Sequence, residues 1–544
     1  MNPWRGYPVP ALRREALYGD RVVHCFTDRP QSLHAVFEKA RAAAAGSDAI
    51  VFEGRRWSYA ETGAAADALA AGLAAQGIAA GDRVVMLMGN RPEFVFVLLA
   101  LLRLGAIAVP VGVREQRPGL AYIARQCGAV AIVFDDALVD RIPDANDAPP
   151  LRWRFAASAL SELASASTAA PPPAPDARET DVAVILYTSG TTGNPKGAML
   201  THLAIVHSLL HFESCMGLRR GDRSALAVPA SHVTGLIAII ASMWQVAGAV
   251  VVMPEFKADA FVRVMAQERV NHTLMVPAMY QLCLLSDATS HADLSAWRIG
   301  GYGGAPMPVA TIDALAQRLP GLALVNAYGA TETTSPTTMM PAGQTRGHAD
   351  TVGVALPAAE IRVMDDDGRE LPAGEVGELW IGGPMVVPGY WADPAATAAS
   401  FTAGFWHSGD LGSVDADGFV RVVDRKKDML NRGGFKIYSV EVENVLMAWP
   451  GVVEAAIVGR PCPVLGERVH AVLHAPGIAH DEASLVRHCA ERLADYKVPE
   501  TFTWSASPLP RNANGKVMKR LLRDSESLRQ EALQTLSTKR GETR

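Results

Sequence analysis

The amino-acid sequence predicts an α/β protein in which a large N-terminal domain precedes a small C-terminal one. Apolar segments of strand length alternate with helical segments over residues 53–111, 186–254 and 271–328. This alternation is typical of strand–helix–strand units built around parallel sheets. The chain has 544 residues, which exceeds the size at which a single hydrophobic core stops growing. We therefore predict two doubly wound sheets in the large domain.

The first of these stretches shows the pattern most clearly. Residues 83–87 and 106–111 have the β-branched, apolar composition of buried strands, and residues 91–104 between them are helical in pattern. Residues 156–180 are rich in Ala, Ser and Pro, and we expect them to form a surface connection between the sheets. Over residues 351–423, turn-forming residues separate short apolar runs, which predicts a small β-barrel or sandwich.

The remainder of the chain predicts a compact α+β domain. Helices are expected to begin near residues 440 and 481, and strands to lie around residues 455–458 and 469–473. We accordingly expect an N-terminal domain of residues 1–424 and a C-terminal domain of residues 425–544.

Composition limits the class of protein. The formal net charge is −5 with both signs interspersed, so no basic surface for nucleic acid is expected. The six cysteines are dispersed and form no C-x-x-C pair, as in the reducing cytosol, and the N-terminus lacks a signal-peptide core, so we expect a cytoplasmic protein. Residues 94–111 and 235–254 are apolar enough to resemble membrane spans. Their β-branched runs and glycines instead indicate a buried helix followed by a buried strand. Peripheral membrane contact stays open, as does the choice between monomer and homodimer.

The most informative segment is residues 187–197, which read YTSGTTGNPKG and follow an apolar run of strand length. Glycines let backbone N–H groups approach an anion, hydroxyls add donors and the lysine adds charge. The spacing is not that of a Walker A loop, because Gly190 and Gly193 stand three apart and Gly197 follows the lysine. The residues expected to hold a polyphosphate are Thr188, Ser189, Gly190, Thr191, Thr192, Gly193 and Lys196.

This loop resembles the phosphate-binding loop of the acyl-adenylate-forming superfamily of AMP-dependent synthetases and ligases. Five later segments resemble the superfamily's other motifs in the same order: GYGGAP at 301–306, NAYGATET at 326–333, WHSGDLG at 406–412, DRKKD at 424–428 and PRNANGK at 510–516. The resemblance runs from about residue 30 to about residue 525. It implies an acyl-CoA synthetase with a mobile C-terminal lid domain, which uses ATP, Mg²⁺ and coenzyme A.

The resemblance also implies the roles of individual residues around ATP. Thr331 would meet the α-phosphate and Glu332 would hold magnesium, for which a carboxylate is a suitable ligand. Lys516 would be the catalytic lysine. The remaining residues expected to bind the nucleotide are Gly303, Gly304, Ala305, Pro306, Tyr328, Gly329, Asp410 and Arg425, of which the last two would hold the ribose.

In the C-terminal domain, the resemblance implies that Lys427 is the hinge about which the domain rotates between two half-reactions. One half-reaction would use the loop with Lys516. The other would use the loop with Gly433 and Gly434, whose small size leaves room for the pantetheine arm of coenzyme A.

The positions that match the superfamily's acid pocket are His232, Thr234, Gly235, Gly301, Tyr302 and Ala327. None of them carries a strongly basic side chain, so a second charge on the acid would be buried without a partner, which is costly. Because Gly301 and Ala327 are small, we expect a cavity larger than acetate requires. A medium or long fatty acid is therefore expected, with an aromatic acid such as a benzoate or 4-coumarate as the alternative. The alternative for His232 is a purely structural role as a buried histidine.

Other functions stay open at this stage. An acyl-AMP ligase that loads a carrier protein would share every motif, and a luciferase-like oxygenase or a non-catalytic nucleotide-binding relative would share most of them. His207, His211 and Cys215 recur every four residues and could share one helix face as zinc ligands. No fourth ligand accompanies them, so we expect them to pack in the core instead.

Overall fold

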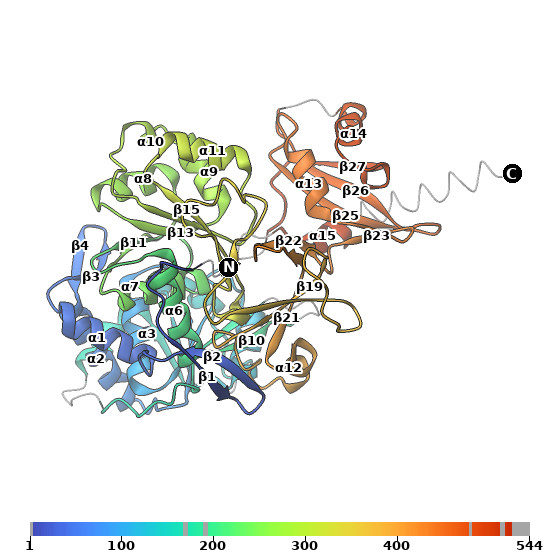
Figure 1. Cartoon of the computed structure of the whole chain (residues 1–544). Coiled ribbons are helices and arrows are strands. Elements are labelled where there is room, and N and C mark those ends of the chain that lie inside the picture. Colours follow the sequence, from blue (N-terminus) through green and yellow to red (C-terminus); the bar gives the residue numbers. More distant parts are fainter. Residues whose placement is uncertain are drawn as a thin grey trace. The chain divides into compact units, whose positions relative to one another are not determined.

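The structure is a computed structural model that describes residues 4–148, 150–166, 172–188, 194–477, 481–511 and 517–524 (Figure 1). The chain divides into two compact units. The first unit comprises Met1–Arg362, Trp380–Ser408 and Val414–Arg421, and the second comprises Val363–Leu379, Gly409–Ser413 and Val422–Arg544.

The first unit contains the two predicted sheets. The smaller sheet has six strands in the order β10 (Lys196–Thr201), β9 (Val182–Thr188), β6 (Ile107–Pro110), β5 (Arg83–Leu87), β7 (Ala131–Phe134), β8 (Trp153–Ala156). All neighbours are parallel except β10 and β9, which form an antiparallel pair. The central strands β5, β6 and β7 are buried on both faces, which explains their continuous apolar composition.

The larger sheet has nine strands. Their order is β17 (Val354–Ala355), β16 (Thr338–Met339), β15 (Ala323–Tyr328), β14 (Ile299–Tyr302), β13 (His272–Met275), β11 (Arg223–Leu226), β12 (Ala249–Val252), β3 (Asp48–Phe52), β4 (Arg55–Ser58). The strands from β15 to β3 are parallel, and antiparallel strands continue the sheet at both ends. The two doubly wound sheets predicted from the sequence are thus confirmed.

One layer of helices fills the space between the sheets. It consists of α1 (Leu33–Ala44), α2 (Tyr59–Ala75), α3 (Pro92–Leu104), α6 (His202–Met216), the π-helix η3 (Thr234–Ala241) and α7 (Ser242–Gln245). The outer face of the larger sheet packs on α8 (Ala258–Gln267), α9 (Pro277–Leu285), α10 (Ala288–His291) and α11 (Val309–Arg318), and that of the smaller sheet on α4 (Arg117–Cys127). Within the described parts of the chain, no helix is both long and apolar enough to span a membrane.

The second unit contains the predicted C-terminal fold. Its sheet has the order β24 (Phe435–Ile437), β23 (Leu430–Arg432), β26 (Gly466–His474), β25 (Glu454–Cys462), with β27 (Thr501–Ser505) beside β26. The sheet packs against α13 (Ser439–Met447) and α14 (Glu482–Ala490). Helix α15 (Lys519–Asp524) contacts β25. The expected starts near residues 440 and 481 and the two expected strands are confirmed. The unit also includes residues 363–379 and 409–413, which the prediction placed in the N-terminal domain.

The expected small β-barrel corresponds to a five-stranded sheet. Its order is β18 (Glu360–Met364), β19 (Gly377–Gly382), β21 (Phe405–Val414), β20 (Phe401–Thr402), with β22 (Val420–Arg425) beside β21.

Three features of the first unit were not part of the sequence-based expectation. The phosphate loop leads into strand β10 before helix α6 begins, because residues 196–201 pair antiparallel with β9. The expected surface connection contains α5 (Leu160–Ser165), which buries two leucines. An N-terminal hairpin of β1 (Leu12–Leu17) and β2 (Arg21–Phe26) was not predicted at all.

Candidate active site

The phosphate loop is held between two paired strands of the first unit. Thr188 ends β9 and Lys196 begins β10, and the two residues lie opposite each other in the antiparallel register. Ser189, Gly190, Thr191, Thr192 and Gly193 lie outside the described residues. The pairing therefore supplies a fixed base for the loop, with one hydroxyl and one ammonium group at its two ends.

The carboxylate of Glu332 lies against this base. Its Oε1 atom accepts hydrogen bonds from Thr188 Oγ1 at 3.2 Å and from the Tyr390 hydroxyl at 3.0 Å. The residue is 7% exposed. Lys196 Nζ lies 5.1 Å from the centre of the Tyr390 ring. Three segments that are distant in sequence thus meet at one carboxylate.

Backbone pairing explains why Tyr390 reaches this position. Gly197 accepts a hydrogen bond from Trp391 N–H at 2.7 Å, and Met199 donates one to Gly389 at 3.2 Å. Burial and the nearby Glu332 carboxylate raise the pKa of Tyr390 above its usual value, so its hydroxyl keeps the proton that it donates. The sequence analysis missed Tyr390, since no spacing pattern links it to Glu332.

The loop before Glu332 is compact. Strand β15 ends at Tyr328, whose half-buried ring packs against a cluster of Ile381, Met385, Val386 and Trp406. Thr331 begins a short 3₁₀ helix, η4 (Thr331–Thr333). The Ala330 N–H donates to Thr333 Oγ1 at 2.9 Å, which stabilises this turn. Roles for Tyr328, Gly329 and Thr331 with a nucleotide stay predictions.

The neighbouring glycine-rich turn follows β14. A Cβ atom on Gly303 would lie 2.4 Å from the Ala327 carbonyl oxygen, so only glycine permits this close approach of the two strand ends. Gly304, Ala305 and Pro306 are exposed and therefore accessible to a ligand.

The predicted acid-pocket residues do not all share one face of the larger sheet. The Tyr302 ring is 1% exposed and lies in the core cluster on the outer face, whereas Ala327 lies in the cluster between the sheets. Gly301 precedes Tyr302 in β14, so the two side-chain positions point to opposite faces. A Cβ atom on Gly301 would lie 3.1 Å from Cγ of Leu274. A side chain at position 301 would therefore press against that leucine.

The other predicted acid-pocket residues come from one short segment. His232 precedes η3, which Thr234 begins and in which Gly235 is buried. Burial lowers the pKa of His232 to about 4, so its ring is neutral at pH 7. A neutral, half-buried ring suits an apolar acid better than a second carboxylate.

In the second unit, Asp410 and Arg425 form an ion pair with 2.5 Å between Oδ1 and Nε. The aspartate is 4% exposed. The adjacent Lys426 pairs with Asp366 at 2.9 Å and with Glu378 at 3.2 Å, whereas Lys427 is exposed. These ion pairs explain why residues 363–379 and 409–413 belong to this unit. Lys427 lies in the turn two residues after β22 ends, and its role as a hinge stays a prediction.

The loop predicted to face pantetheine lies in the same unit. Gly433 and Gly434 both have left-handed backbones, with φ of 60° and 91°. Gly433 N–H donates to the Leu465 carbonyl at 2.7 Å and Gly434 N–H to Asn431 Oδ1 at 3.1 Å. The predicted catalytic residue Lys516 lies outside the described residues, so its role stays a prediction.

The groups around Glu332 fit a magnesium ion in their chemistry. Carboxylate and hydroxyl oxygens are hard donors of the kind that Mg²⁺ prefers, and phosphate oxygens of ATP would complete its shell.

The histidines on α6 that could have been zinc ligands form hydrogen bonds to the backbone instead. His207 and His211 bond backbone groups of Phe26, Leu203 and Pro357. Within the described residues, no cluster of three or more His, Cys, Asp or Glu side chains is arranged to hold a metal.

Comparison with protein families decides the identity of the chain. Residues 37–391 match the family model of the AMP-binding enzyme, and residues 441–516 match that of the AMP-binding enzyme C-terminal domain. The chain belongs to the AMP-binding enzyme family. It is an AMP-forming acid–thiol ligase, and the α/β architecture with a smaller C-terminal domain is that of this family.

Several relatives of known name cover most of the chain. It is 34% identical to the long-chain-fatty-acid–CoA ligase FadD13 of Mycobacterium tuberculosis, over 87% of this chain and 93% of the relative. It is 34% identical to a feruloyl-CoA synthase of Amycolatopsis, over 87% and 94% of the two chains. It is 33% identical to the fatty acid–[acyl-carrier-protein] ligase ScoC of Streptomyces coeruleorubidus, over 88% and 93%.

A solved structure gives the same picture. The o-succinylbenzoate CoA synthetase MenE of Bacillus subtilis, in complex with its acyl-adenylate intermediate, superposes with a TM-score of 0.83 at 27% identity. The match covers 92% of this chain and 99% of MenE.

Proposed function

We propose that this AMP-binding enzyme activates an apolar carboxylic acid with ATP and transfers the acyl group to coenzyme A. The observation that carries the proposal is the buried Glu332 carboxylate, which Thr188 and Tyr390 hold beside Lys196 at the base of the phosphate loop. A carboxylate next to an ammonium group at a phosphate loop suits a substrate that is itself a magnesium-bound polyphosphate.

The first half-reaction needs charge stabilisation rather than a general base. A carboxylic acid has a reference pKa of about 4, so at pH 7 its oxygen is already the nucleophile. This oxygen attacks the α-phosphorus of ATP, and pyrophosphate leaves with the electrons of the broken P–O bond. Lys196 and Lys516 offset the negative charge that gathers on the phosphate oxygens. A magnesium ion held by Glu332 would neutralise further charge on the same oxygens.

The second half-reaction forms the thioester. The acyl-adenylate is a mixed anhydride, so the sulfur of coenzyme A attacks its carbonyl carbon, the thiol proton goes to solvent and AMP leaves. The loop of Gly433 and Gly434 would pass the pantetheine arm, and Lys427 would be the pivot between the two half-reactions. Asp410 and Arg425 would bind the ribose through the carboxylate and guanidinium that they present as an ion pair.

The acid is proposed to be a medium- or long-chain fatty acid. Its site would lie between the sheets, where Ala327 and η3 contribute to an apolar core and His232 is neutral. The relation to FadD13 supports this choice, and the equal identity to a feruloyl-CoA synthase supports an aromatic acid as the second candidate. The relation to ScoC makes a carrier protein the alternative thiol acceptor.

The deciding experiment compares acetate, octanoate, palmitate, benzoate and 4-coumarate, each with ATP and Mg²⁺, with and without coenzyme A. We expect coenzyme A-dependent AMP release and a thioester product, with octanoate or palmitate as the best substrate. Best activity on acetate would refute the proposed acid. AMP release that stays independent of coenzyme A would refute the acceptor.

A further inference from the structure

Asn90 connects the two sheets of the first unit at the carboxyl ends of their strands, where ligands are expected. It lies in the turn between β5 and α3 and is 9% exposed. Its Oδ1 accepts from Ala230 N–H at 2.8 Å, and its Nδ2 donates to the carbonyls of Val228 at 2.9 Å and Met253 at 3.0 Å. A third carbonyl, that of Leu226, lies 3.3 Å from Nδ2. One side chain thus bonds to the segments that follow β11 and β12.

The orientation of this amide is dictated by its partners. Ala230 N–H can only donate, so the amide oxygen must face it, and the carbonyls can only accept, so the amide nitrogen must face them. The side chain therefore uses both of its N–H groups and its oxygen on backbone atoms. An amide of this size is the one side chain that serves all of these partners without leaving a buried polar group unpaired.

The segment that Asn90 holds leads directly to His232. Ala230 lies two residues before it, and the His232 N–H donates to the Pro229 carbonyl at 3.2 Å. On the other side, a Cβ atom on Gly235 would lie 2.3 Å from the same Pro229 oxygen, so η3 is packed tightly on this segment. His232 is therefore fixed between a contact to the smaller sheet and the first turn of η3.

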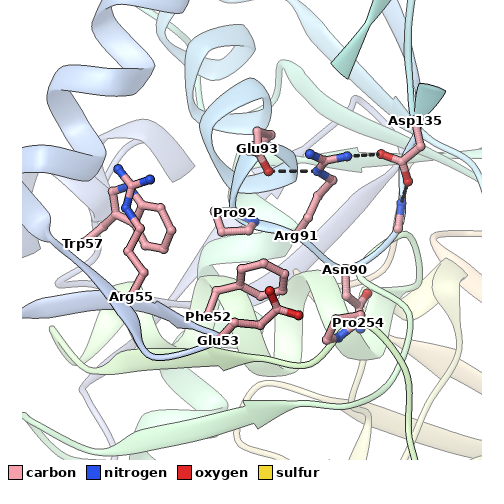
Figure 2. Close-up of a pocket in the computed structure, with 11 residues that line it drawn as sticks. Phe52, Glu53, Arg55, Trp57, Asn90, Arg91, Pro92, Glu93, Asp135 and Pro254 are labelled. Atoms are coloured by element: carbon pink, nitrogen blue, oxygen red, sulfur yellow. Dashed lines mark hydrogen bonds and ion pairs between the residues drawn. The ribbon is translucent and has the colours of Figure 1, made fainter. Parts of the chain in front are cut away.

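The turn with Asn90 is itself held by Asp135, which follows β7. Figure 2 shows the Asp135 carboxylate beside the Arg91 guanidinium. Its Oδ2 accepts from Gly89 N–H at 2.7 Å and its Oδ1 from Arg91 Nη1 at 3.0 Å. These residues line a surface cavity of about 580 Å³. Contacts thus run from the end of β7 through the Asn90 turn to the segment that carries His232.

We infer that Asn90 is a positioning residue for acid binding: its amide sets the place of His232 at the mouth of the acid pocket. This inference rests on the proposed function, in which His232 borders that pocket. Loss of the amide lets the 228–232 segment shift relative to η3, and such misplacement typically costs about tenfold to a hundredfold in rate. The hydrogen bonds among Thr188, Glu332 and Tyr390, where the nucleotide is proposed to bind, do not involve this segment.

The experiment compares Asn90→Ala with a matched control, Asn271→Ala. Asn271 also bridges strands of the larger sheet, because its Oδ1 accepts from Arg223 N–H at 2.9 Å and its Nδ2 donates to Ala296 at 3.3 Å. It lies at the opposite, amino ends of β11 and β13. Both variants lose an amide that bonds to backbone, but only one of them lies next to His232.

With the best of the five acids, Asn90→Ala should raise the KM for the acid about tenfold or more while the KM for ATP stays within about twofold. Asn271→Ala should change neither constant. Adding Asn90→Ala to His232→Ala should raise the acid KM little further, because the two residues act together. An equal rise in both KM values, or an effect of Asn271→Ala on the acid alone, would overturn the inference.

A second readout does not depend on activity. Hydrogen–deuterium exchange of residues 228–236 should increase in Asn90→Ala and stay as in the wild type in Asn271→Ala. If the exchange of this segment is unchanged in Asn90→Ala, the inference is overturned whether or not the enzyme uses any of the five acids. If the enzyme uses none of the five acids, that result by itself refutes only the proposed function. If Asn90→Ala does not fold, Asn90→Asp replaces it, since this variant keeps the shape and the acceptor for Ala230 but loses the donors.

Discussion

Mild acid is expected to release the N-terminal hairpin from helix α6. Two buried histidines hold the last residue of this hairpin and the first residue of α1. His207 Nε2 accepts from Phe26 N–H at 3.1 Å, and His202 Nδ1 accepts from Leu33 N–H at 3.1 Å. An imidazole accepts a hydrogen bond only when it is neutral. Burial lowers the pKa of each ring to about 4, and both rings are 5% exposed or less.

The magnitude follows from proton linkage. In an opened state that exposes both rings to water, each regains the ordinary pKa of about 6.5, so opening binds protons as the pH falls. The stability of the closed state is therefore fully present well above pH 6.5 and is lost as the pH falls toward 4. Between pH 7.5 and 5.5 each ring lowers the free energy of opening by about 1.3 kcal/mol. Together they increase the opened population by roughly a hundredfold.

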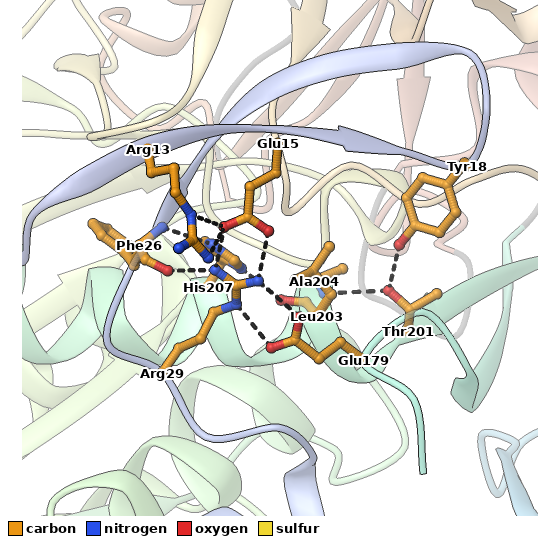
Figure 3. A network of polar contacts seen from close by, with 10 residues as sticks. All are labelled: Arg13, Glu15, Tyr18, Phe26, Arg29, Glu179, Thr201, Leu203, Ala204 and His207. Carbon is orange, nitrogen blue, oxygen red and sulfur yellow. Dashed lines mark hydrogen bonds and ion pairs between the residues drawn. The ribbon is translucent and has the colours of Figure 1, made fainter.

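Other charges near the hairpin do not reverse this sign. Figure 3 shows Arg29 between Glu15 and Glu179, with His207 close to them. The ion pair with Arg29 lowers the pKa of Glu15 to about 2, so this carboxylate keeps its charge throughout the range. The ion pairs therefore contribute the same cost of opening at pH 7.5 and at pH 5.5, and the pH dependence comes from the histidine contacts.

The assay is hydrogen–deuterium exchange of residues 21–33 at pH 7.5 and 5.5, corrected for intrinsic exchange rates. The control variant His207→Gln removes one titrating ring and should reduce the hundredfold response to about tenfold. A corrected exchange rate that does not depend on pH would refute the reasoning. Equal acceleration in strands β25 and β26 of the second unit would show global rather than local opening.

Three substitutions test the proposed catalytic groups. Lys516→Ala should reduce acid-dependent pyrophosphate exchange by about a hundredfold or more while thioester formation from supplied acyl-AMP survives, and near-normal exchange would contradict this role. Lys427→Pro should leave adenylation intact and abolish transfer to coenzyme A, because proline restricts φ at the proposed pivot; equal loss of both steps would place the hinge elsewhere. Tyr390→Phe should raise the Mg²⁺ concentration for half-maximal AMP release about tenfold, because Glu332 loses a group that orients it. An unchanged Mg²⁺ titration would separate Tyr390 from the metal.

The sequence predicted the architecture because buried parallel strands and their helices leave strong apolar patterns. It did not reveal the π-helix η3, since a segment that is apolar on every side shows no period that would distinguish π from α. The hairpin of β1 and β2 did carry a signal, because two segments of strand length flank the turn around Gly19.

Only those residues of the candidate site that belong to a sequence motif could be predicted. Thr188, Lys196 and Glu332 belong to recognisable segments, and the structure brings them together. Tyr390 could not be found this way, because its position depends on backbone pairing with β10 rather than on local pattern. The grouping of Gly301 with Tyr302 conflicts with the alternation of side chains along a strand, which the sequence alone already implies.

The ion pairs of Arg29 have a practical consequence for anyone who shortens this protein. The family match begins at residue 37, which would be a natural place to start a trimmed version. Such a chain would lose Arg29, which pairs with Glu179, and Phe26, whose N–H donates to His207. Because the Phe26 side chain is fully buried, its loss would also expose the apolar surface that it covers. A boundary before Leu12 keeps all three of these contacts, which a boundary at residue 37 removes.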